Sequence, residues 1–526
     1  MTKMKGLLLG AAAGLASVAS AQAADLPVKA APVEYVKVCS LYGAGFFYIP
    51  GTDTCLKIGG YLRSDHMYGS GSQAGYYLTT AQGTNPTFTR TGTDEYSWRA
   101  RVNLTVDFRT QSDYGTIRAY AAIIGQQSTA DLGNTTGAAG ILRAFIQFAG
   151  FTVGHAVSYY DFMNGADYGY VASIWAPSTG VNGTDLLAYT WQIGNGFSAS
   201  IDIEDGPGGR GKTIFNLSNP GVLNGGGAAA LGGFPNLVVP GLGSSDILRS
   251  DMPDIAANLR VDQAWGSAQI MGALANRSAG YYSNVPGLPG LGFVGPGNTA
   301  GFNPGNQVFG HPGEAWGYAV GVGAKFVNFL LPRDTIEGQA SFCHGAVTGY
   351  CVSGLYAQNF IYGSGNTITM GYTADGVITN GSQVELTNAF NWALGYQHYW
   401  SPQWRTAVVG GQAFVWYNGT AAGMFCGGAV GSAGAFGANG LFVAFPGTFQ
   451  NCNPNFSQSA VSTRTAWNPH PFLEIGLDLI YFHVATANAG STVILNTNAA
   501  RPGGLYRIGD FDGAMAVLRF QKNILP

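Results

Sequence analysis

Apolar and polar side chains alternate along several stretches of the chain, which is the pattern of a β-strand with two unlike faces. In the clearest stretch, residues 98–108, every second residue is apolar and the residues between them are Arg, Asn, Thr or Asp. In a soluble sandwich such a polar face meets solvent, whereas in a transmembrane barrel the apolar face meets lipid and the polar face lines water. Shorter or weaker alternation occurs at residues 199–204, 257–262, 315–325, 388–399 and 473–481.

The connections between the predicted strands fall into two length classes. Seven are short turns, at residues 111–115, 149–150, 194–196, 263–266, 331–334, 400–403 and 468–471. They alternate with eight long stretches, at approximately residues 67–95, 126–140, 156–186, 205–253, 276–314, 346–387, 417–461 and 485–512. An even number of strands with short turns at one end and long loops at the other is typical of a bacterial outer-membrane barrel. The sequence therefore predicts an all-β, 16-stranded antiparallel transmembrane β-barrel with both termini on the short-turn side.

The composition supports a β protein with few charges. Glycine supplies 80 of 526 residues, which disfavours a helical chain because each glycine inside a helix costs about 1 kcal/mol relative to alanine. Charged residues make up only 10% of the chain, and the aromatic share of 13% argues against disorder. The formal net charge of −3 gives no basic footprint, so nucleic acid is not an expected partner.

A barrel of this size has consequences for function. At sixteen strands the interior is too wide for wall side chains to fill, which predicts a water-filled channel for passive diffusion of small hydrophilic solutes and ions. We expect no enzyme activity, no cofactor and no metal site, because neither a catalytic triad nor a metal-ligand spacing stands out in the sequence. Two alternatives are a secreted or surface-exposed Gly-rich β protein, acting as an adhesin or structural component, and a narrower outer-membrane barrel with a catalytic cluster at its rim.

The first residues have the three parts of a secretory signal peptide in order. Lys3 and Lys5 precede the apolar residues 6–16, and Ala21-Gln22-Ala23 has the form of a cleavage site. We predict a signal peptide over residues 1–23, cleaved after Ala23, and export to the bacterial outer membrane. The apolar outer wall of the predicted barrel would contact outer-membrane lipid and lipopolysaccharide.

Export permits disulfides, and the six cysteines lie in three locally close pairs. Loop-closure entropy favours local pairing, although sequence alone leaves fifteen connectivities open. We expect an N-terminal segment, residues 24–54, that a disulfide joins to a barrel formed by residues 55–526. The favoured pairs are Cys39 with Cys55, Cys343 with Cys351, and Cys426 with Cys452.

Two blocks of sequence resemble the general porins of alphaproteobacteria. One comprises PVEYVKVC at residues 32–39, YGAGFFYIPGTDTC at residues 42–55 and KIGGY at residues 57–61. The other comprises AFIQFAGFTVG at residues 144–154, followed by SYYDF at residues 158–162. The resemblance implies a homotrimeric, sixteen-stranded diffusion porin whose third outer loop folds into the barrel and narrows it.

The third long stretch, residues 156–186, is accordingly the candidate constriction loop. It carries Asp161 and Asp167, and it would face five arginines on four successive N-terminal strands. Carboxylates on the loop and guanidinium groups on the wall would set up a transverse field that orients dipolar solutes. The alternative is structural, with each arginine paired to a wall acid such as Asp65 or Asp107. The predicted basic wall consists of Arg63, Arg99, Arg101, Arg118 and Arg143.

Overall fold

The computed structural model describes most of the chain from residue 38 to residue 524. The described residues are 38–69, 96–129, 138–171, 179, 183–205, 213–216, 252–282, 310–352, 359–364, 366–379, 381–426, 452–495 and 504–524. The predicted signal peptide, residues 1–23, lies outside them. Within these ranges, no helix is long and apolar enough to cross a membrane.

Sixteen long antiparallel strands form one closed barrel, as the sequence predicts. Each strand pairs with its neighbours in chain order, and β2 pairs with β24 to close the sheet. The strands are β2 (Cys55–Gly69), β3 (Tyr96–Ser112), β4 (Gly115–Ser128), β5 (Ala138–Phe148), β6 (Phe151–Ala156), β7 (Thr184–Gly194), β8 (Phe197–Asp205), β10 (Asp254–Gln263), β11 (Gly266–Arg277), β12 (Ala315–Val327), β13 (Thr335–His344), β18 (Asn388–Tyr399), β19 (Trp404–Trp416), β20 (Phe456–His470), β21 (Leu473–Ala485) and β24 (Phe511–Asn523).

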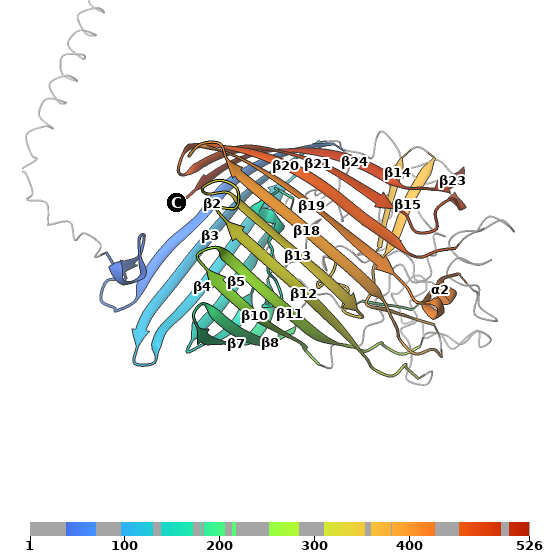
Figure 1. Cartoon of the computed structure of the whole chain (residues 1–526), viewed down its shortest axis with the longest axis horizontal. Coiled ribbons are helices and arrows are strands. Elements are labelled where there is room, and N and C mark those ends of the chain that lie inside the picture. The colour runs from blue at the N-terminus through green and yellow to red at the C-terminus, as the bar shows by residue number, and fades with distance from the viewer. Residues whose placement is uncertain are drawn as a thin grey trace, which may run out of the picture.

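The two ends of the barrel differ as the connection lengths predict. All seven predicted short turns join consecutive strands at one end, where the C-terminus also lies (Figure 1). At two of them, Ala149-Gly150 and Asn195-Gly196, both central residues have positive φ, the conformation of tight hairpins that follow the strand twist. The described parts of the long connections lie at the opposite end, called here the outer end (Figure 1).

The alternation of side chains separates the outer wall from the lumen. On β3, Trp98, Val102 and Phe108 are exposed on the outer wall, whereas Arg99 and Asp107, on the alternate positions, are buried on the lumen side. The same division holds on β21, where Leu477, Leu479 and Tyr481 are exposed. The outward side chains thus form the apolar surface that lipid requires.

The outer-end connections contain further elements that the sequence analysis did not predict. Two small sheets lie there, one of four strands and one of three. The first consists of β14 (Asn359–Ser364), β15 (Thr367–Tyr372), β22 (Thr492–Leu495) and β23 (Gly504–Ile508), and the second of β9 (Ile214–Asn216), β16 (Gly376–Ile378) and β17 (Glu385–Leu386). A short helix, α2 (Gly419–Cys426), follows β19.

These elements pack onto inward-facing apolar side chains of the wall. Ile480, Phe482 and Val517 face the lumen from β21 and β24, and they share a buried cluster with Met370 and Ile508 of the outer-end connections. The protein's largest apolar core therefore lies inside the outer half of the barrel. The cluster leaves the short-turn half of the lumen to polar side chains.

All three predicted disulfides are present. Cys39 pairs with Cys55, Cys343 with Cys351, and Cys426 with Cys452. The first joins β2 to the short segment that contains η1 (Ser40–Tyr42) and β1 (Phe47–Tyr48).

Candidate pore constriction

The third long connection, called here loop 3 (residues 157–183), has its two ends tied together. The backbone N–H of Ser158 donates to Oγ1 of Thr179 at 2.8 Å. The backbone N–H and the hydroxyl of Thr179 both donate to Oδ2 of Asp161, each at 2.5 Å. These bonds tie Ser158, Asp161 and Thr179 together at the base of the loop.

Loop 3 crosses the lumen to the far wall. The backbone N–H groups of Phe162 and Met163 donate to Oε1 of Gln339 on β13, at 3.2 and 2.9 Å. After the short helix η3 (Gly165–Asp167), the backbone N–H of Tyr170 donates to Oδ2 of Asp478 on β21 at 2.6 Å. The inward fold of the third loop, which the resemblance implied, is therefore present in the structure.

Two tyrosine side chains of loop 3 also pack against the far wall at positions occupied by glycine. A Cβ on Gly476 would lie 1.9 Å from the hydroxyl oxygen of Tyr170, and one on Gly395 would lie 2.6 Å from the ring of Tyr168. The Tyr168 hydroxyl donates to Oε2 of Glu337 at 3.0 Å, and that of Tyr170 donates to Oε1 of Glu474 at 2.8 Å. These glycines account for part of the glycine excess.

The two predicted loop acids lie in different surroundings. Asp161 is at the base of the loop, where it accepts the two bonds from Thr179 and lies near Arg143. Asp167 lies at the end of η3, beside Lys325 and Arg464. The Asp167 side chain is exposed to the lower cavity, but the protein that surrounds it raises its pKa above the ordinary value, against the opposing effect of these two cations.

The first three arginines of the predicted basic wall belong to β2 and β3. Arg99 is 2% exposed and donates to Oδ2 of Asp65 at 2.8 Å, so it adopts the wall pairing that the sequence offered as the alternative. Arg101 donates to Oε1 of Gln126 at 3.0 Å, and Arg63 donates to Oε1 of Gln521 at 2.8 Å. Arg63 and Arg101 thus each donate to a neutral amide oxygen, whereas Arg99 donates to a carboxylate.

The remaining two predicted arginines also have partners. Arg118 forms an ion pair with Asp107 at 3.0 Å, and Arg109 shares that carboxylate at 2.8 Å. Arg143 donates to the backbone oxygen of Thr179 at 3.3 Å, which places it against the base of loop 3. The structure therefore brings Arg143 and Asp161 together and holds Arg118 in a wall ion pair.

The sequence analysis missed a second group of basic residues, which continues from β2 onto β24 and the strands beyond it. Together with Arg63 they line a cavity of about 740 Å³ below loop 3, at the short-turn end, called here the lower cavity. Ala166, Asp167 and Tyr170 of loop 3 border it, and its carboxylates are Asp167 and Glu474. The alternation of polar and apolar residues could have revealed Arg464 and Arg519, since each lies between two outward-facing residues, on β20 and on β24 respectively. The arginines that the sequence analysis missed are Arg333, Arg405, Arg464 and Arg519.

Comparisons with known proteins agree with this geometry. A family profile described as "Porin subfamily" matches residues 25–502. Porin Omp2b of Brucella suis is 32% identical over 284 residues, which are 52% of this chain and 66% of the relative. Porin Omp2b of Brucella abortus strain 2308 is 36% identical over 214 residues, which are 39% of this chain and 54% of the relative. The chain thus spans between about half and two thirds of the length of these relatives.

Among solved structures, the outer membrane channel DcaP of Acinetobacter baumannii has a similar fold. It superimposes with a TM-score of 0.54 at 12% sequence identity, and the superposition covers 91% of this chain and 99% of that one. The barrel fold is therefore shared even where the sequences have diverged.

Proposed function

This chain belongs to the porin subfamily, and from that premise we propose that it forms a passive, water-filled channel of the bacterial outer membrane for small hydrophilic solutes and ions. The observation that carries this proposal is a closed sixteen-stranded barrel crossed by a loop, with a charged, polar cavity beneath that loop. A diffusion channel needs no cofactor and no covalent step. No relative or structural feature described above favours an adhesin.

The passage narrows where loop 3 faces the basic wall. Arg63 and Arg101 present guanidinium groups there, while Arg99 and Arg118 act through their ion pairs with Asp65 and Asp107. The loop acids Asp161 and Asp167 supply the negative side of a transverse field, and Arg143, which lies near Asp161, belongs to the basic side. Such a field orients dipolar solutes and favours polar ones over apolar ones.

Single-channel recording tests the channel function. The purified full chain, added to a planar lipid bilayer in KCl, is expected to produce stable, stepwise increases in conductance, and the same preparation boiled in detergent is expected to produce none. Folded protein that never yields conducting steps would contradict the proposal. Swelling of liposomes in sugars of increasing size would then give the size limit of the passage.

We further propose that three copies associate, and the outer wall indicates which face they share. On β7 and β8 the outward side chains are large and apolar, such as Trp191 and Ile201. On β19, β20 and β24 many are small or polar, and lipid tails offer such groups no hydrogen bonds. These outward residues are Gly410 and Gln412 on β19, Ser457, Ser459, Thr463 and Thr465 on β20, and Ala514 and Ala516 on β24.

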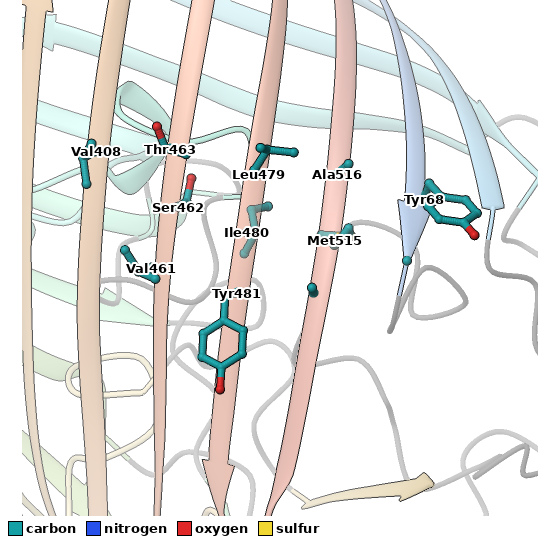
Figure 2. A pocket seen from close by; sticks show the side chains of 12 residues that line it. Tyr68, Val408, Val461, Ser462, Thr463, Leu479, Ile480, Tyr481, Met515 and Ala516 are labelled. Carbon is teal, nitrogen blue, oxygen red and sulfur yellow. The ribbon is translucent and has the colours of Figure 1, made fainter.

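A groove of about 560 Å³ lies on the same face. Figure 2 shows its side chains, with Tyr68 on one side, Leu479 and Tyr481 on the other, and Ala516 between them. Small residues on β24 therefore create a recess bordered by larger ones. We assign this recess to a second copy of the chain, because small outward residues allow another protein surface to approach closely. Lipid and lipopolysaccharide contact the apolar remainder of the wall.

Native mass spectrometry of the detergent-extracted protein tests the assembly. We expect a trimer for the unmodified chain and a large loss of trimer for Ala514→Trp, which fills the recess. The matched control Ala257→Trp, on the outward face of β10, is expected to remain trimeric. A monomeric unmodified chain, or equal effects of the two variants, would show that lipid rather than protein occupies this face.

A further inference from the structure

The lower cavity is strongly basic although the whole chain is acidic. Its lining contains five arginines and two carboxylates, a formal charge of 5 − 2 = +3, against −3 for the entire chain. The arginines are Arg63, Arg333, Arg405, Arg464 and Arg519. They come from β2, from the turn after β12, and from β19, β20 and β24, so the fold brings together residues that are far apart in sequence.

The cavity has fewer carboxylates than arginines, although Arg464 lies directly opposite Asp478 in the strand pairing. Arg405 forms an ion pair with Glu474, and Arg519 forms one with Asp65 in the wall, at 2.6 Å. Arg63 donates to the amide of Gln521, and Arg333 stacks 4.2 Å from the ring centre of Tyr399. Like charges therefore lie close together around one polar space, an arrangement that an anion would stabilise.

Arg464 is the central residue of this arrangement. Its side chain is 5% exposed, and Nη2 donates to the backbone oxygen of Asp167 at 2.7 Å and to Oε1 of Gln397 at 2.8 Å. Its Nε is buried and has no hydrogen-bond partner among the described residues. Arg464 also lines the lower cavity, so an oxyanion bound there would compensate the charge of its guanidinium group.

Tyr170 of loop 3 holds two of the guanidinium groups in place. The guanidinium carbon of Arg519 lies 3.8 Å from the centre of its ring, and that of Arg464 lies 5.5 Å from it. The hydroxyl of the same tyrosine is fixed by Glu474. The two guanidinium groups are thus held in position before any ligand binds, which lowers the entropy cost of binding.

Building on the channel function above, we propose that the lower cavity is a binding site for a small polyvalent oxyanion, such as inorganic phosphate or a dicarboxylate. Planar guanidinium groups match the paired oxygens of phosphate and carboxylate. The cavity, of about 740 Å³, is much larger than a phosphate ion, so the ligand binds there together with water. Such anions are therefore concentrated at the short-turn end of the passage.

Calorimetric titration of the detergent-solubilised full chain with inorganic phosphate tests the site directly. We expect saturable binding that weakens about tenfold in Arg464→Gln, because one charge-assisted contact is lost. Arg464→Lys keeps the charge but loses the fork and is expected to give an intermediate affinity. The matched control Arg260→Gln removes a lumen arginine of β10 that is paired with Asp262 outside the cavity, and it is expected to bind like the unmodified chain.

Bilayer recording separates failure of the site from failure of the channel. In KCl, added phosphate is expected to reduce the single-channel current in a saturable manner, less so in Arg464→Gln than in Arg260→Gln. Conducting channels without saturable phosphate binding would overturn the site and leave the channel function intact. Saturable binding to protein that does not conduct would keep the site and overturn the channel. Retained heat-modifiable migration in gels identifies the variants that have folded.

Discussion

Two buried arginines at opposite ends of the lumen have opposite surroundings. At the outer end, Arg277 is 1% exposed and lies between the carboxylates of Asp254, at 3.1 Å, and Asp375, at 2.9 Å. At the short-turn end, Arg464 is almost as buried, yet its hydrogen bonds go to neutral oxygens. Where the protein packs against itself, the cation is matched by the protein's own acids. Where a solute passes, part of the charge of the buried arginine remains to be matched by the solute.

Removing Arg277 should have the largest effect, a fall in the free energy of unfolding. Arg277→Met would leave Asp254 and Asp375 buried without their cation, and breaking such a pair costs about 3–5 kcal/mol. Arg464→Gln should cost clearly less, because no carboxylate depends on it for a hydrogen bond. Urea unfolding of the protein folded in lipid bilayers measures both. Equal losses in the two variants would remove the distinction between the two ends.

The disulfide of the outer region should have the next largest effect. Cys343→Ser with Cys351→Ser opens a short loop that carries Tyr350, whose hydroxyl donates to Glu204 at 2.6 Å. Closing a loop of this size is worth about 2–3 kcal/mol. We expect the outer connections to become sensitive to protease. The double variant Cys39→Ser with Cys55→Ser, at the other end, should leave them resistant, and the reverse result would contradict the assignment.

Charge removal on the basic wall should change selectivity rather than stability. For Arg99→Ala combined with Arg101→Ala we expect a wider passage and a fall of about twofold in the permeability ratio of anions to cations. Arg99→Ala alone should contribute less, since Asp65 already neutralises that cation. Reversal potentials in a KCl gradient measure the ratio. An unchanged ratio in the double variant would exclude both residues from the constriction.

The smallest expected effect is a pH dependence of selectivity. Because the surrounding protein desolvates Asp167 in part and raises its pKa, this carboxyl is protonated at a higher pH than an ordinary aspartate. Its protonation removes a negative charge beside Lys325, Glu337 and Arg464, so the preference for anions should rise as the pH falls. Asp167→Asn should have the raised preference already at neutral pH and should lose most of the change. Reversal potentials at pH 7 and pH 5 provide the comparison.

The barrel could be predicted because each of its strands carries its own signal. Residues 98–108 alternate, and Asn195-Gly196 has the chemistry of a tight turn, so neither prediction requires knowledge of distant residues. The elements of the outer end carry no such signal. The helix α2, for example, is capped by the side chain of Asn418, which accepts from the backbone N–H of Ala421 at 2.7 Å, and it is held at its end by Cys426.

The site was predicted only in part because its geometry depends on register across the sheet. Arg99 was correctly placed on the lumen face, but its partner is set by the strand pairing that brings Asp65 directly opposite it. Arg464 is 297 residues from Asp167, whose backbone oxygen it contacts. No local pattern reports a contact of that separation, so the second group of arginines emerges only from the folded chain.

Asp65 also has a consequence for the order of events during biogenesis. It lies directly opposite Arg99 on one side and Arg519 on the other, and it forms an ion pair with each. The carboxylate is synthesised among the first strands, whereas Arg519 follows 454 residues later. Its full complement of partners exists only once the last strand has met the first. The contact between the first and last strands thus includes an ion pair that forms only in the closed barrel, and a truncated or misregistered chain lacks it.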